Sequence, residues 1–177
     1  MSVVINGSAG VTTNSGAVYN GIQAGTAVAS TSGTSIDFTG IPSWVKRITV
    51  MFNGVSTNGT SNILFQLGTS SGIDVTGYLG SVTRFGVSAL GSAFSSAGFP
   101  LNLNAATEVY AGAITFSLIG SNAWAASGNF GASNGATYIF VCGGSKTLAG
   151  TLDRIRITTV NGTDTFDAGS INILYEG

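Results

Sequence analysis

Apolar residues alternate with polar or small residues along most of this chain. A period of two is typical of β-strands that bury one face. The alternation predicts about eight to ten strands, the clearest of them at residues 35–38, 47–52, 63–67, 114–118, 137–142, 154–157 and 171–175, with weaker candidates at 82–85 and 123–126. No window has the period of a long amphipathic helix, and the only helical expectations are short turns near 88–92 and 105–108.

Asn-Gly pairs separate many of these runs. Asn-Gly is a strong hairpin signal, because both residues tolerate the positive φ angles that a tight turn between strands requires. The pairs stand at residues 6–7, 20–21, 53–54, 58–59, 134–135 and 161–162. Short strands joined by such turns predict an all-β fold, an antiparallel β-sandwich of the jelly-roll kind.

The run at 137–142 is apolar on both faces. Ile139 and Val141 share one face, and Tyr138, Phe140 and Cys142 share the other. An isolated sandwich exposes one face of each sheet to water, so the second apolar face needs a cover. Another copy of the same chain is the simplest cover, and we therefore expect a homo-oligomer.

The first 24 residues differ from the rest of the chain. They carry no charge, are rich in glycine, serine and threonine, and contain short β-prone pieces at 3–5 and 10–13. Such a segment cannot form a core of its own. We expect an extended N-terminal attachment arm at residues 1–24, which adds a strand to a neighbouring sheet, and a β-sandwich domain at residues 25–177.

The composition argues against catalysis. Only 7% of the residues are charged, none is histidine, and 27 of 177 are glycine, whereas an ordinary soluble domain is about 25% charged. Acid–base catalysis and metal binding draw mainly on the residue types that are scarce here. We expect a non-enzymatic protein with no catalytic residues, no cofactor and no metal, and a chain that works within an assembly.

Charge and hydropathy also limit the partners. A net charge of −1 offers nothing to a phosphate backbone, so no nucleic-acid partner is expected. No apolar run approaches the ~18 residues of a membrane-spanning helix, and the N-terminus lacks the basic and apolar regions of a signal peptide. We expect no membrane association, and folding in a cytosol.

Two chemical motifs are incomplete, and cysteine occurs only once. Residues 138–147, YIFVCGGSKT, resemble a phosphate loop, but Ser145 stands where that loop needs glycine before Lys146, and a hairpin turn is favoured. Asp164 and Asp167 miss the spacing of a calcium loop, and as turn aspartates they are expected to bond their own backbone. Cys142, the only cysteine, is expected to be a small buried apolar residue.

Two tryptophans are candidate contact residues. Trp44 comes just before a predicted strand, where core packing or a subunit contact would explain it. Trp124 stands between alanines in a glycine-rich stretch. An exposed loop position there would let its ring stack on a sugar, which makes a host surface glycan a candidate ligand.

Arginines form the second group of candidate contacts. Arg154 and Arg156 are two apart on a predicted strand and therefore share a face; together with Lys46 and Arg47 they make up four of the six basic residues. Either this face is solvated, or these side chains pair with acidic groups of another subunit. The candidate acidic partners are Asp37, Asp153 and Asp164.

Two stretches are similar to a known group of proteins. Residues 36–68, IDFTGIPSWVKRITVMFNGVSTNGTSNILFQLG, and 152–177, LDRIRITTVNGTDTFDAGSINILYEG, resemble small tailed-bacteriophage and prophage proteins described as virion structural or tail-fibre-like. Residues 122–131, NAWAASGNFG, and 4–13, VINGSAGVTT, fit the same pattern. The resemblance implies a β-rich, often trimeric particle component, and it supplies no catalytic residue.

The leading hypothesis is a homotrimeric tail-fibre or tail-tip protein, attached to other virion proteins through its N-terminal arm. Such a protein would be assembled in the host bacterial cytoplasm and reside in the virion. The alternatives are a head decoration protein that stabilises the capsid, a carbohydrate-binding adhesin module, and a depolymerase. A depolymerase would need two carboxylates, for which Asp164 and Asp167 are the nearest pair in the sequence.

Overall fold

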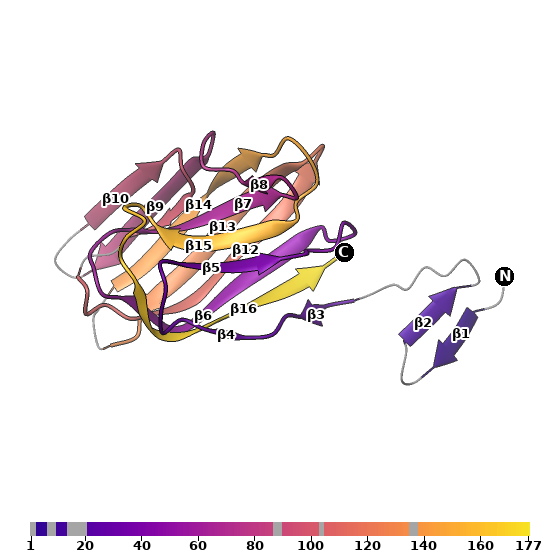
Figure 1. The fold of residues 1–177 in the computed structure, drawn as a ribbon, viewed down its shortest axis with the longest axis horizontal. Coiled ribbons are helices and arrows are strands. Elements are labelled where there is room, and N and C mark those ends of the chain that lie inside the picture. The colour runs from indigo at the N-terminus through magenta and orange to yellow at the C-terminus, as the bar shows by residue number, and fades with distance from the viewer. Residues whose placement is uncertain (1–2, 7–9, 14–20, 87–89, 103–104, 135–137) are drawn as a thin grey trace.

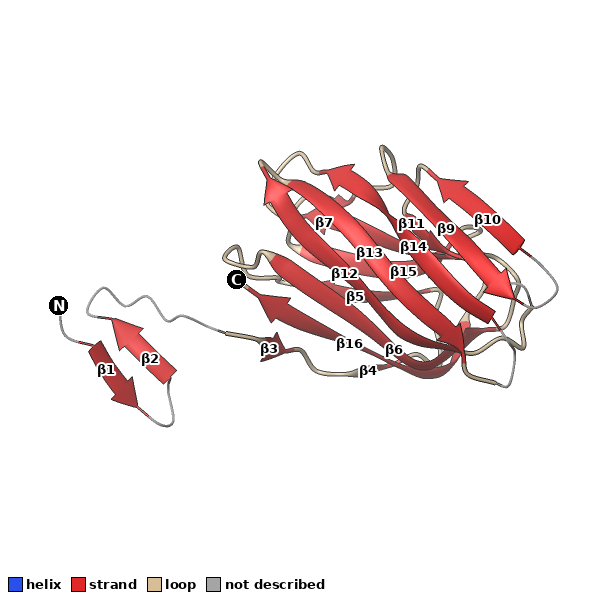
Figure 2. Cartoon of the chain, turned by 180° about the vertical axis from the view of Figure 1, so that it is seen from behind, coloured by secondary structure: helices blue, strands red, loops and turns tan. Residues whose placement is uncertain are grey.

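Two antiparallel β-sheets pack face to face, which confirms the predicted all-β sandwich (Figures 1 and 2). The structure is a computed structural model, and it describes residues 3–6, 10–13, 21–86, 90–102, 105–134 and 138–177. Figure 1 shows the smaller sheet in front of the larger one, and Figure 2 shows the larger sheet from its outer side.

The large sheet has the strand order β10-β9-β14-β13-β12-β6-β16-β3, and β4 also pairs with β16. Its strands are β3 (Gln23–Ala24), β4 (Val28–Ala29), β6 (Arg47–Thr57), β9 (Leu79–Gly86), β10 (Leu90–Ser95), β12 (Tyr110–Gly120), β13 (Ala123–Ala132), β14 (Tyr138–Thr147) and β16 (Phe166–Glu176). The C-terminal strand β16 is therefore an interior strand, placed between β6 and the short strands β3 and β4.

The small sheet has the order β11-β7-β15-β5, with β8 paired to β7. Its strands are β5 (Ser35–Thr39), β7 (Ile63–Thr69), β8 (Gly72–Ile73), β11 (Phe99–Leu101) and β15 (Arg154–Thr159). Each sheet contains strands from both halves of the chain, so the sandwich is one domain rather than two consecutive stacks of hairpins.

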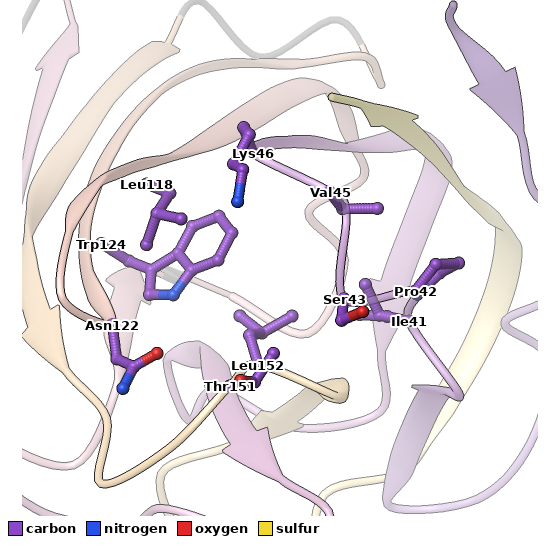
Figure 3. A pocket seen from close by; sticks show the side chains of 10 residues that line it. All are labelled: Ile41, Pro42, Ser43, Val45, Lys46, Leu118, Asn122, Trp124, Thr151 and Leu152. Atoms are coloured by element: carbon purple, nitrogen blue, oxygen red, sulfur yellow. The ribbon is translucent and has the colours of Figure 1, made fainter. Parts of the chain in front are cut away.

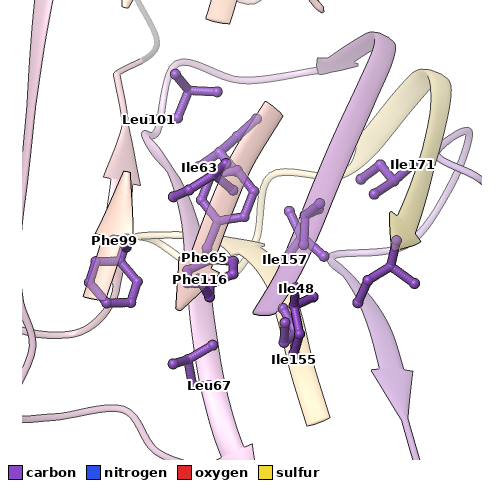
Figure 4. Packing of buried hydrophobic residues seen from close by; sticks show 14 of the residues in the cluster. Ile48, Ile63, Phe65, Leu67, Phe99, Leu101, Phe116, Ile155, Ile157 and Ile171 are labelled. Carbon is purple, nitrogen blue, oxygen red and sulfur yellow. The ribbon is translucent and has the colours of Figure 1, made fainter. Parts of the chain in front are cut away.

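The core lies between the sheets and is rich in phenylalanine (Figure 4). The ring of Phe65 stacks on Phe130 at 5.8 Å between centroids and lies 5.3 Å from Phe52 and 6.4 Å from Phe116. As the alternation predicts, the inward positions of the core strands are fully buried, among them Ile48, Val50, Ile63, Leu67, Ile155, Ile157, Ile171 and Ile173. Burial of these side chains is the main source of stability.

The chain before the sandwich contains two further strands, β1 (Val3–Asn6) and β2 (Gly10–Thr13), which pair with each other from Val3↔Thr13 to Asn6↔Gly10. They match the β-prone pieces expected in the arm. The structure does not describe residues 14–20. Three of the predicted Asn-Gly turns, at 6–7, 20–21 and 134–135, each contain one residue outside the described part of the chain. The sheet itself begins inside the expected arm, because Gln23 pairs with Tyr175 and Gly25 N donates to Ile173 O at 2.7 Å.

Two local expectations are wrong. The helical turn expected near 88–92 is not present over its described part, because Leu90–Ser95 forms β10 through pairing with β9. The hairpin turn expected within 138–147 is instead one continuous strand, β14. Gly144 lets that strand approach β9, since a Cβ built on it would lie 1.9 Å from Leu79 O and its φ is +149°. The expectation near 105–108 is met by a turn, in which Glu108 N donates to Ala105 O at 3.0 Å.

Candidate functional site

The most distinctive surface is the outer side of the large sheet at its β10 end. Leu90, Phe85 and Ile139 face one another in a row across β10, β9 and β14. Their exposed fractions are 77%, 46% and 51%, and Phe94 on β10 is 66% exposed. These side chains point away from the core, because the strands place Val82, Phe140 and Cys142 on the buried side.

Leu79 and Val141 extend this apolar surface along β9 and β14 and are also exposed. We define the apolar face as Leu79, Phe85, Leu90, Phe94, Ile139 and Val141. Between them lie small side chains, Ser81, Thr83, Ser92 and Gly143, which form shallow hollows beside Phe85 and Val141. No charged residue stands at an outward position of β9, β10 or β14 as the structure describes them.

An uncharged apolar face of this kind is typical of a surface that is covered by another protein. Soluble monomers rarely expose contiguous apolar patches larger than a few hundred Å². The two-sided apolar pattern at 137–142 indicates this face in the sequence, because Ile139 and Val141 lie outward while Phe140 and Cys142 lie inward. The contributions of β9 and β10 have no comparable signal, since their apolar residues are spaced by serine, glycine and threonine.

Trp124 is buried, which contradicts its expected place in an exposed loop (Figure 3). It lies in β13 between Leu118 on β12 and Lys146 on β14, and only 3% of it is exposed. The ring therefore has no free face on which a sugar could stack. Its Nε1 has no hydrogen-bond partner among the described residues, and a cavity of about 90 Å³ beside it is lined also by Lys46 and Leu152.

Trp44 packs within its own chain. It lies in a turn just before β6, where Val45 N donates to Pro42 O at 3.1 Å, and its side chain is half-buried against the core. A Cβ on the terminal Gly177 would lie 2.5 Å from Trp44 Cε3, so the chain end runs closely past the ring. This placement matches the packing alternative for Trp44.

The candidate arginines lie on two different sheets, each beside an acidic group of the same chain. On the small sheet, Arg156 binds Asp37 with two hydrogen bonds, of 2.8 Å from Nε and 2.7 Å from Nη2. Its neighbour Arg154 pairs with Asp153 at 2.8 Å.

On the large sheet, Arg47 pairs with Glu176. The hydrogen bond to Glu176 raises the pKa of Arg47 above its usual value. The arginines therefore do not form one basic face, and the acidic partners of the two on the small sheet come from within the chain. Both small-sheet pairs are partly solvated and contribute little to stability.

Lys146, the lysine of the phosphate-loop-like segment, is buried and engaged in a structural contact. Its Nζ lies 2.9 Å from Asp74 Oδ2, donates to Thr76 O at 2.9 Å, and stands 5.1 Å from the centre of the Tyr78 ring. The positive charge of the ammonium group is therefore paired with the Asp74 carboxylate inside the fold. It is not presented to a phosphate group by a loop.

The two aspartates considered for calcium or hydrolysis both accept hydrogen bonds within the fold. Asp164 accepts hydrogen bonds from Asn161 Nδ2 at 2.6 Å and Ser61 N at 3.0 Å, and these bonds lower the pKa of its carboxyl group. Asp167 accepts a hydrogen bond from the Ser56 hydroxyl. Among the residues that the structure describes, no group of three or more histidine, cysteine or acidic side chains could hold a metal ion.

The single thiol is expected to be unreactive in the folded protein. Burial raises the pKa of Cys142 to about 12, and its Sγ lies 3.7 Å from Gly128 O. A raised thiol pKa favours the neutral form of Cys142 in the folded chain. The contribution of this group to folding stability is therefore present below the ordinary thiol pKa of about 8.5 and is lost as the pH rises toward 12.

Iodoacetamide at pH 8 should modify Cys142 in the native chain far more slowly than in the chain unfolded by guanidinium. Equal rates would contradict the burial of this thiol.

No protein-family model and no curated protein matches this chain. Among solved structures, the crystal structure of a protein of unknown function from Shewanella oneidensis MR-1 aligns with 99% of this chain and 74% of that one, at 9% identity and a TM-score of 0.28. So weak a likeness carries no argument about fold or function. The described residues contain no helix that is long and apolar enough to span a membrane.

Proposed function

We propose that this chain is a non-enzymatic structural protein of a tailed-bacteriophage or prophage virion, a homo-oligomer that forms part of a tail fibre or tail tip. The observation that carries the proposal is the apolar face on the outer side of the large sheet, which a particle component would bury against other protein. The resemblance of residues 36–68 and 152–177 to virion structural proteins supplies the class of particle.

The state of the ionisable groups supports a structural role. Lys146 pairs with Asp74, Arg154 with Asp153, Arg156 with Asp37 and Arg47 with Glu176. Three of these pairs join neighbouring strands or turns, and Arg154 and Asp153 are adjacent in the chain. The paired side chains do not converge on a common cleft where a substrate could be bound and turned over.

The beginning of the sheet supports attachment through the N-terminal arm. Gln23 pairs with Tyr175 at the end of β16, so residue 23 and the C-terminus lie at the same end of the large sheet. In this proposal the arm leaves the sandwich at this end and adds a strand to a neighbouring protein. The trimeric state and the virion location follow from the resemblance and are part of the proposal.

A head decoration protein is the second candidate. The specific feature in its favour is that the apolar face lies on an open sheet surface rather than in a cleft, a shape that could lie against a capsid shell. Gold-labelled antibody to this chain on intact particles separates the two functions. Label on the tail supports the fibre or tip, and label over the head supports the decoration protein.

Deleting residues 1–20 tests the attachment step. The deletion keeps β3 and β4, which pair with β16, so the truncated chain should fold with little change in melting temperature. Its incorporation into particles should fall to background when it is supplied in place of the full chain, as measured by immunoblot of gradient-purified particles. Incorporation at the level of the full chain would overturn attachment by the arm.

A further inference from the structure

Strand β10 is an edge of the large sheet. It pairs with β9 on one side, from Leu90↔Phe85 to Ser95↔Gly80, and its other side has no partner strand in the described part of the chain (Figure 2). Natural edge strands are usually protected from pairing by charged side chains, proline or a bulge. The sequence of β10, LGSAFS, contains no charge and no proline, and its register with β9 is unbroken.

The side chains of β10 are arranged symmetrically about Ser92. Two positions to either side, Leu90 and Phe94 are large, apolar and 77% and 66% exposed on the outer side of the sheet. One position to either side, Gly91 and Ala93 are small and point inward, where they are half-buried. A strand with this arrangement is complementary to an antiparallel copy of itself.

We propose that β10 pairs antiparallel with β10 of a second copy of this chain, about a two-fold axis through Ser92. In this register Leu90 of each copy stands opposite Phe94 of the other, and Gly91 stands opposite Ala93. Directly opposed residues of antiparallel strands lie on the same face of the sheet, so the apolar pairs form on the outer side. The inference goes beyond the proposed function, because it requires no particle.

The register is selective. A shift by one residue would place outward side chains opposite inward ones, and a shift by two would place both Leu90 and Phe94 opposite serine. Only the register centred on Ser92 pairs both large side chains of both copies. It also continues the row of Ile139, Phe85 and Leu90 into Phe94 of the second copy.

Charge favours a second copy as the occupant of this edge. A two-fold contact brings the same surface patch of both copies together, so an edge of one charge sign would repel its copy. The outward positions of β9, β10 and β14 carry no charge, and a second copy can approach without that repulsion. The pairing doubles the number of chains in any assembly formed through other surfaces.

Light scattering of the purified chain at micromolar concentration tests the pairing. Ser92→Lys places two lysines opposite each other on the axis, where like charges oppose pairing, and it should halve the mass measured for the wild-type chain. Ser127→Lys is the matched control, because Ser127 is exposed on the outer side of β13, three strands from the edge and outside the apolar face. It should keep the wild-type mass.

A pair of oppositely charged variants distinguishes loss of pairing from a folding defect. Ser92→Asp alone should also give half the wild-type mass, and an equimolar mixture of Ser92→Asp with Ser92→Lys should restore the full mass. A wild-type mass that equals that of Ser92→Lys, or a mixture that stays at half mass, would overturn the proposal. These measurements use the isolated chain, so their failure leaves the proposed virion function untouched.

A disulfide test reports the register directly. Opposed residues of antiparallel strands have Cα atoms about 4.5 or 5.5 Å apart, within the range of about 4.4–6.8 Å that a disulfide allows. Ser92→Cys should therefore crosslink under mild oxidation to a species of twice 17.7 kDa, whereas Ser127→Cys on β13 should not. The native Cys142 is buried and should not contribute. Equal crosslinking of the two variants, or none at Ser92→Cys, would overturn the register.

Discussion

Removing residues 170–177 is expected to leave the chain insoluble. These residues form most of β16, which pairs with β6 along its length and with β3 and β4 on its other side. Ile171 and Ile173 are fully buried in the core. The truncation would leave β3 and β4 without their partner strand, expose the backbone of β6 as a new edge, and uncover the core beneath β16.

The measurement is the soluble fraction after expression, followed by thermal unfolding of whatever remains in solution. A chain that lacks only Gly177 is the control, because it keeps all of β16, and it should stay soluble and unfold cooperatively. A soluble 170–177 truncation with a cooperative unfolding transition would show that β16 is dispensable, and would contradict its interior position in the sheet.

Ile157→Ala is expected to lower the free energy of unfolding by about 2–5 kcal/mol, the range for deleting a large buried aliphatic side chain. Ile157 is fully buried in β15, the interior strand that joins β7 to β5 in the small sheet (Figure 4). The substitution leaves a cavity between the sheets. For a chain of this size the melting temperature should fall by on the order of 10 °C.

Ile119→Ala is the matched control for Ile157→Ala, since Ile119 lies near the end of β12 and is 70% exposed. It should change the unfolding free energy by less than about 0.5 kcal/mol. Guanidinium unfolding, followed by the fluorescence of Trp44 and Trp124, measures both variants at one protein concentration. Equal losses for the two substitutions would contradict the assignment of the core.

The inward faces of the long strands were predictable from the sequence. Alternation marks Ile48 and Val50 on β6 and Ile155 and Ile157 on β15, and all four are fully buried. Period two is a local property, and burial follows it wherever one face of a strand meets the core.

Elements set by contacts between distant residues were not predictable. The strand β10 is rich in serine, glycine and alanine, and only its pairing with β9 makes it a strand. The pair Gly143-Gly144 is typical of a turn, yet here Gly144 permits a close approach to the backbone of β9. Local sequence cannot distinguish these two uses of glycine.

The surroundings of the candidate contact residues were also not predictable from the local sequence. The spacing of Arg154 and Arg156 correctly places both on the outer side of one strand. Their neighbourhood depends on the sheet to which the strand belongs, and Arg47 proves to lie on the other sheet, beside Glu176, 129 positions away. Trp124 resembles a loop residue among alanines and glycines, but pairing of β13 with β12 and β14 buries it.

The central claim is that this chain is a component of a virion, and mass spectrometry of purified particles tests it most directly. Particles from the cells that produce the chain are separated on a density gradient, and each fraction is analysed for its peptides. The account predicts that the chain peaks in the same fractions as the other virion proteins, in a fixed ratio to them. Recovery of the chain only in fractions free of particles would contradict the account.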